Sequence, residues 1–198
     1  MTGGTLLHTP LCAAAFGHDH TFLLRHAAFR ENLMPEEASR TDRTEPGALE
    51  RQCGSCTACC DGWLKIEVYG HRIDRGQPCP FSTGHSCTIY ERRPKDPCRD
   101  FVCGWLARTS PLPEWMRPDK AGMILLPANF RWQDHPVDVA VAVGERPKTK
   151  ALDWLKSFCA ERKRLLIYQM GDDWYAFGPP AFQHEMHDRI GRGERPWI

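Results

Sequence analysis

The sequence lacks both an excess of one charge and a long apolar run. Its 198 residues include 26 Lys and Arg and 25 Asp and Glu, so the formal net charge is +1. This balance gives no reason to expect a nucleic-acid groove or an anionic membrane as partner. No apolar run approaches the roughly 18 residues of a spanning helix, and the apolar stretch near the N-terminus lacks the basic start of a secretory signal. We expect a cytoplasmic protein with an unknown protein or small-molecule partner, binding neither nucleic acid nor membrane.

Glycine-rich phosphate loops are also missing, and the apolar content is modest at 41%. No Gly-x-Gly-x-x-Gly pattern indicates a nucleotide or a methyl donor. Residues 1–50 are polar and show no sustained hydrophobic period. Because such a stretch buries too little apolar surface to form a core, we expect residues 1–50 to be a flexible leader.

Cysteine, in contrast, is abundant and clustered. Eight of the ten cysteines lie between Cys53 and Cys103, and the stretch CGSCTACC holds four of them. In a small secreted domain eight cysteines would form four disulfides, whereas in a reducing cytosol the same clustering indicates metal ligation. The spacing of Cys53, Cys56 and Cys59 is too tight for pairing among themselves, and this favours metal.

Thiolates suit zinc and iron–sulfur clusters rather than magnesium or calcium. Both groups take four cysteines, and the Cys-Pro at Cys79 is similar to the end of a ferredoxin cluster run. Neighbouring side chains diverge, so Cys59 and Cys60 either serve two centres or leave one thiol as packing. The predicted metal ligands are Cys53, Cys56, Cys59, Cys60, Cys79, Cys87, Cys98 and Cys103.

Basic residues follow closely after Cys87. Buried anionic centres need positive neighbours, and we expect the side chains between Cys87 and Cys103 to lie over the sulfurs. The predicted cofactor-binding residues are Arg92, Arg93 and Arg99. No catalytic residue is indicated by any pattern in the chain.

These motifs resemble a known family. CGSCTACC, followed by CTIYERRPKDPCRDF, resembles the YkgJ-type cysteine-cluster proteins, whose CxxCxxCC domain is described as zinc- or iron-chelating. The resemblance covers residues 53–106 and departs from the pattern in one place, where three residues rather than two separate Pro94 from Cys98. It implies a metal site at the cysteines named above. A related domain occurs in flagellin lysine N-methylases, but this chain shows no methyl-donor loop, so that activity is not expected here.

The remaining sequence has the alternation of a small α+β unit. Strands are predicted at residues 64–68 and 136–143, a helix at residues 148–164, and two strands across the Gly-Asp-Asp turn at residues 171–173. The expected fold is α+β, with a small cysteine-rich metal-binding module packed on a small antiparallel sheet with one or two helices. Its expected parts are the leader 1–50, the cysteine module 51–108, the α+β unit 119–182 and a C-terminal helix and tail 183–198.

Two functions fit this sequence. In the first, the chain binds an iron–sulfur cluster or zinc through the cysteine cluster, with a possible redox role. In the second, the module is a structural zinc clip in a non-enzymatic binding or adaptor protein.

Overall fold

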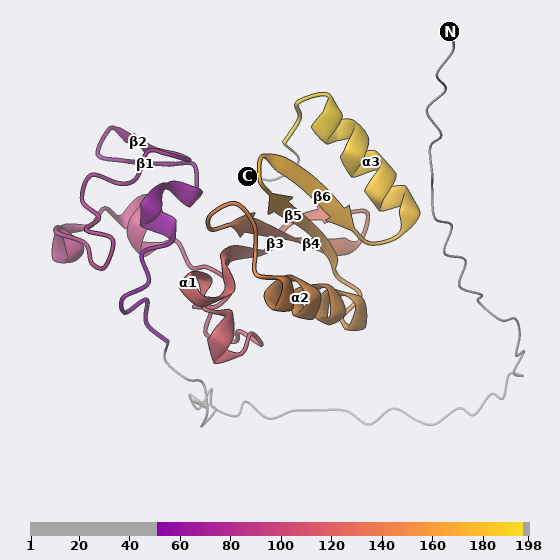
Figure 1. Ribbon diagram of the computed structural model, residues 1–198, viewed down its shortest axis with the longest axis horizontal. Coiled ribbons are helices and arrows are strands. Elements are labelled where there is room, and N and C mark those ends of the chain that lie inside the picture. The colour runs from indigo at the N-terminus through magenta and orange to yellow at the C-terminus, as the bar shows by residue number, and fades with distance from the viewer. Residues whose placement is uncertain (1–50, 196–198) are drawn as a thin grey trace, which may run out of the picture. The chain divides into compact units, whose positions relative to one another are not determined.

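The computed structural model describes residues 51–195, which belong to one compact unit (Figure 1). The predicted leader and Cys12 lie outside the described residues. In the described part of the chain the α+β fold class is confirmed, with a two-stranded and a four-stranded sheet. No helix between residues 51 and 195 combines the length and the apolar character needed to span a bilayer.

The larger sheet has the strand order β3-β4-β5-β6. Its strands are β3 (Met123–Trp132), β4 (His135–Ala142), β5 (Leu165–Met170) and β6 (Asp173–Phe177). Two pairings are antiparallel, but β4 and β5 run parallel, so the sheet is mixed where a purely antiparallel one was expected. The cause is the helix α2 (Thr149–Glu161) between them, since parallel strands need a crossover connection.

Helices cover both faces of this sheet. Leu155 of α2 packs with Leu125 and Leu166 on one face. Phe182 of α3 (Pro180–Gly191) packs with Val139 and Ile167 on the other. Figure 1 shows the same layering, with α2 and α3 on opposite sides of the strands. The helix predicted at residues 148–164 is therefore confirmed as α2, and the predicted C-terminal helix is confirmed as α3.

One buried charge lies in the central strand β4. Asp138 is only 1% exposed, and its carboxylate accepts a hydrogen bond of 2.6 Å from Nε of Arg164. It also accepts a bond of 2.7 Å from the backbone N–H of Ala128, at the bulge in β3. Since both carboxylate oxygens are engaged, Asp138 joins β3, β4 and the start of β5 instead of remaining an unpaired charge.

The cysteine region has much less regular structure. Its only strands are β1 (Ile66–Val68) and β2 (His71–Ile73), which pair as a short antiparallel hairpin. Single helical turns lie at Cys59–Trp63, Tyr90–Arg92 and Lys95–Arg99. A turn at Glu114–Met116 and the short helix α1 (Pro118–Ala121) then connect this region to β3. The strand predicted at residues 64–68 forms over Ile66–Val68, while Leu64 lies just before it; Leu64 and Val68 are both buried.

Gly62 allows the first of these turns to lie against the next loop. Its φ is +91°, and a Cβ at this position would lie 2.7 Å from the backbone oxygen of Asp74. Only glycine can adopt this conformation and leave room for so close an approach. The turn that carries Cys59 and Cys60 is therefore fixed against the chain just before Cys79.

The cysteine region and the sheet share a core. Ala58 and Leu64 pack in the same apolar cluster as Ile124 and Val139. Gly104 donates a backbone hydrogen bond of 2.7 Å to the carbonyl of Leu125 in β3. The cysteines are thus held at one side of β3 by burial of apolar side chains and by main-chain pairing.

Candidate metal centre

Every one of the eight predicted ligands lines the same cavity. The cavity has a volume of about 220 Å³, and its walls include Cys53, Cys56, Cys59, Cys60, Cys79, Cys87, Cys98 and Cys103. The rest of the lining is mostly apolar, with Phe81, Phe101 and Trp105 among its members. Sulfurs separated by up to fifty positions in the sequence are therefore brought to one place by the fold.

Tight turns aim the first four cysteines at this cavity. The N–H of Cys56 donates to the carbonyl of Cys53 at 2.9 Å, and the N–H of Cys60 donates to the carbonyl of Thr57 at 2.7 Å. A two-residue gap closed in this way directs successive thiols to one side of the chain.

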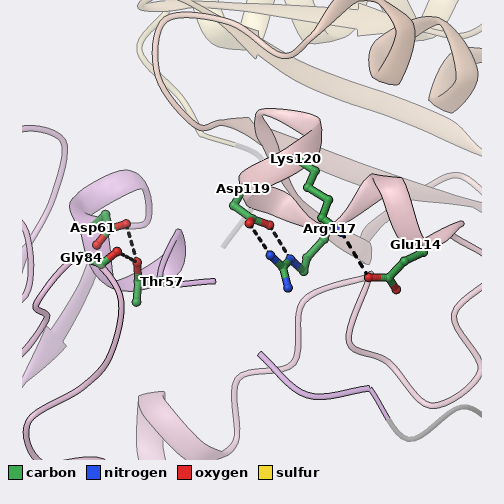
Figure 2. Close-up of polar contacts among 7 residues, drawn as sticks. All are labelled: Thr57, Asp61, Gly84, Glu114, Arg117, Asp119 and Lys120. Atoms are coloured by element: carbon green, nitrogen blue, oxygen red, sulfur yellow. Dashed lines mark hydrogen bonds and ion pairs between the residues drawn. The ribbon is translucent and has the colours of Figure 1, made fainter. Parts of the chain in front are cut away.

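Polar contacts fasten the turn to the following loop. Asp61 accepts hydrogen bonds from the hydroxyls of Thr57, at 2.8 Å, and Ser82, at 3.0 Å. The Thr57 hydroxyl also lies 3.0 Å from the carbonyl oxygen of Gly84, an alternative acceptor for its proton. Figure 2 shows Thr57 between these two oxygens. The loop carrying Cys79 and Cys87 is thereby held beside the first quartet.

A sulfur–sulfur hydrogen bond links the neighbouring residues Cys59 and Cys60. Their Sγ atoms lie 3.8 Å apart and share one proton in a hydrogen bond. That bond, followed by burial, raises the pKa of Cys59, whereas the same bond lowers the pKa of Cys60. Cys60 therefore forms a thiolate, which is the form that binds metal, more readily than Cys59.

Most of the other thiols resist ionisation. Burial is the largest cause that raises the pKa of each of four residues: Cys53, Cys79, Cys98 and Cys103. Neighbouring thiolates add to it, because a second negative charge nearby is unfavourable in a poorly hydrated site. A cation bound at these thiols would offset this cost for all of them at once, and its binding would release their protons.

Of the three predicted cofactor-binding arginines, only Arg93 forms part of the cavity wall. Its positive charge acts to lower the pKa of Cys53, Cys60 and Cys98, but burial has the stronger effect on all three. Only at Cys60, where the hydrogen bond with Cys59 is the main cause, is the pKa lowered overall. Its guanidinium lies 3.5 Å from the centre of the Tyr90 ring, which holds the side chain in place. Arg92 and Arg99 are exposed and are not among the residues that line the cavity.

Arg117 is a second cation near the sulfurs, which the sequence analysis did not single out. Cys56 contributes to raising its pKa, although the hydrogen bond to Asp119 is the main cause. Its Nε and a terminal nitrogen contact the two oxygens of Asp119 at 2.7 and 2.6 Å (Figure 2). It lies more than fifty positions from Cys56, so no local pattern could have indicated it.

The cavity fits a thiolate-bound group by its donor chemistry and by its size. It exceeds the roughly 150 Å³ of an apolar cavity that can hold a benzene molecule, so it has room for more than a single ion. All nine cysteines described by the structure are free thiols, with no disulfide among them. Within residues 51–195 no group of three His, Cys, Asp or Glu side chains already surrounds a metal-sized point.

Cys159 shows the contrast with a cysteine outside the cavity. It lies on α2, is fully buried, and packs in the core of the sheet as the sequence predicts. Burial raises its pKa to about 12, and the nearby Asp138 carboxylate acts in the same direction. Of the eight cavity cysteines, only Cys103 packs against the apolar cluster that Cys159 joins.

Comparison with protein-family models, with curated proteins and with solved structures gives no match to this chain.

Proposed function

We propose that the chain is a metal-binding protein that holds an iron–sulfur cluster or zinc in the cysteine-lined cavity. The observation that carries this proposal is the convergence of eight free cysteines on one cavity of about 220 Å³. Bringing so many polarisable thiols together is unfavourable if they ionise alone and favourable if they ligate a cation. The resemblance of residues 53–106 to the YkgJ-type domain supports the same proposal.

Iron–sulfur chemistry is the first choice because of the cavity's size and the run of three cysteines at two-residue gaps. A single zinc ion with four sulfurs at about 2.3 Å leaves no need for so large a space. An iron–sulfur cluster would supply one-electron transfer, and Arg93 would stabilise its negative charge. Free thiols throughout the described region favour a reducing compartment, so we place the protein in the cytoplasm.

A structural zinc clip is the second candidate. The observation favouring it is the scarcity of regular structure around the cysteines, where β1 and β2 are three residues each. Regions with so little hydrogen-bonded framework commonly depend on metal for their fold. In this case the partner would be a protein or small molecule bound elsewhere.

Anaerobic purification followed by elemental analysis tests the proposal. A coloured sample with iron and acid-labile sulfide, bleached by dithionite, supports the cluster; a colourless sample with zinc supports the clip. Cys56→Ser should lower the metal content, whereas Cys159→Ala, outside the cavity, should leave it unchanged. A freshly purified wild-type chain without bound metal, which also takes up none under reducing conditions, would overturn the proposal.

A further inference from the structure

Apolar packing divides the cavity's cysteines into two groups. Cys56, Cys59 and Cys103 pack against the cluster that contains Ala58 and Leu64. The second group packs against the cluster of Val68 and Ile73, and it consists of Cys60, Cys79 and Cys98. None of these six cysteines packs against both clusters, whereas Ile66 does and so lies at their boundary.

Backbone contacts place the two remaining cysteines. Cys53 is joined to Cys56 by a hydrogen bond of 2.9 Å that closes the turn between them. Cys87 pairs with Ser82 in a β-bridge, and the N–H of Ser82 donates to the carbonyl of Cys79 at 2.9 Å. Cys53 therefore belongs with the first group and Cys87 with the second.

Cys59 and Cys60 form the junction between the groups. Adjacent side chains on a turn diverge, and these two enter different apolar clusters although their sulfurs are 3.8 Å apart. The carbonyl of Cys60 accepts a hydrogen bond of 2.8 Å from the N–H of Cys79, which fixes Cys60 to the second group. Each of these two consecutive cysteines therefore supplies one sulfur to its own group.

We propose that the cavity holds two metal centres, one ligated by Cys53, Cys56, Cys59 and Cys103 and the other by Cys60, Cys79, Cys87 and Cys98. This inference rests on the proposed function, to which it adds a second centre and the division of ligands. Four sulfurs satisfy one tetrahedral zinc or one four-iron cluster, so eight satisfy two with none left over.

The charges around the sulfurs agree with two centres. Each four-thiolate centre is a net anion, and two of them in one cavity need cations on both sides. Arg117 lies against the turn of the first group, since a Cβ at Gly54 would lie 3.9 Å from its guanidinium, and Asp119 holds its side chain. Arg93 lines the cavity, where its positive charge favours thiolates of both groups, at Cys53 in the first and at Cys60 and Cys98 in the second.

Metal content of the full chain is the first test. The chain is loaded in parallel with zinc alone and with ferrous iron plus sulfide under anaerobic conditions. We expect about two zinc ions per chain, or about twice the iron and sulfide of a single four-iron cluster. Alkylation of the loaded native wild type, read by peptide mass spectrometry, should find all eight cavity cysteines protected. The two-centre inference would be overturned if the chain bound only enough metal for one centre and four or more cavity cysteines reacted. The proposed function would still stand.

Paired substitutions test the division itself. Cys53→Ser and Cys87→Ser alter the members that lie in neither apolar cluster, and each should halve the metal content. Cys87→Ser with Cys98→Ser should lose the same half as Cys87→Ser alone, whereas Cys53→Ser with Cys87→Ser should lose nearly all. Ser86→Ala, which changes the residue beside Cys87 without removing a sulfur, should lose none.

The outcomes separate the two proposals. A wild-type chain that binds no metal overturns the proposed function and this inference together. Bound metal that disappears completely in either single variant, or that survives either one unchanged, overturns only the division into two sets. If a variant fails to fold, as judged by loss of the far-ultraviolet circular dichroism of the sheet, the wild-type stoichiometry and alkylation pattern still decide.

Discussion

The cysteine region, residues 51–106, and the sheet region, residues 123–191, have different sources of stability. In the sheet region β4 is buried on both faces, from Val137 to Ala142, and two helices cover it. The cysteine region has strands of three residues and a cavity lined by sulfur where a core would otherwise lie. Burial of hydrocarbon stabilises the first region, and we infer that ligation by sulfur stabilises the second.

Removing metal should separate the two regions most clearly. Under reducing conditions, a strong chelator should abolish the hydrogen-exchange protection of residues 53–106 and leave that of β4 and β5 in place. The free energy at stake is large, because structural zinc contributes about 10–16 kcal/mol of apparent binding energy in small domains. Hydrogen exchange read by mass spectrometry before and after chelation provides the measurement. Equal hydrogen-exchange protection of residues 53–106 before and after chelation would show that metal does not stabilise the cysteine region.

Asp138→Ala should weaken the sheet region instead. The substitution leaves Arg164 without its carboxylate and the N–H of Ala128 without its acceptor. We expect the free energy of unfolding to fall by about 3 kcal/mol, the lower end for breaking a buried ion pair, because Arg164 can still reach water. Denaturant unfolding of the metal-loaded chain measures it. The exposed Asp153→Ala serves as control and should change stability by less than about 0.5 kcal/mol.

Gly62→Ala should weaken the turn that carries Cys59 and Cys60. Both Gly62 and Gly76 have positive φ, but a Cβ at Gly76 meets nothing within 4 Å, whereas one at Gly62 meets backbone at 2.7 Å. Each substitution carries a conformational cost of about 1 kcal/mol, and Gly62→Ala should cost about 2 kcal/mol more. Thermal unfolding of the two variants tests this. Similar melting temperatures for both would show that the turn and the loop can move apart.

The smallest predicted effect concerns charge at the cavity wall. Arg93→Gln removes the cation beside Cys53 and Cys60, so ligand thiolates should form less readily and metal affinity should fall about tenfold. Arg92→Gln removes an equal charge from the neighbouring exposed position and should leave affinity unchanged. Competition with a chelator of known affinity compares the two variants at one ionic strength. The same loss in both would mean that overall charge, and not contact with the cavity, is responsible.

Local pattern was sufficient for much of the fold. Leu152, Leu155 and Cys159 repeat at the helical period and lie on the buried face of α2. The Gly-Asp-Asp turn between two apolar runs predicted the β5–β6 hairpin, which forms. These features depend on neighbours within a few residues, and such neighbours are visible in the sequence.

The burial of both faces of β4 could not be predicted from the local sequence pattern. The alternation in residues 136–143 predicted a strand with valines along one side, and in the structure Asp138 and Ala140 on its other side are as buried as the valines. Only the placement of α2 and α3 on opposite faces explains this, together with the partner that Arg164 provides for Asp138. No local period records which faces are covered by helices from elsewhere in the chain.

By itself, the sequence determined which atoms are available for ligation: eight thiols at spacings suited to tight turns, with a run of basic residues among them. The tertiary structure decided that these thiols share one cavity, and that Arg93 and not Arg92 or Arg99 lines it. It also brought Arg117 against Gly54 in the first turn and packed Cys59 and Cys60 in different apolar clusters. The reason is physical: residue type fixes what a side chain can bind, whereas its distance from other side chains is set by long-range burial and backbone pairing.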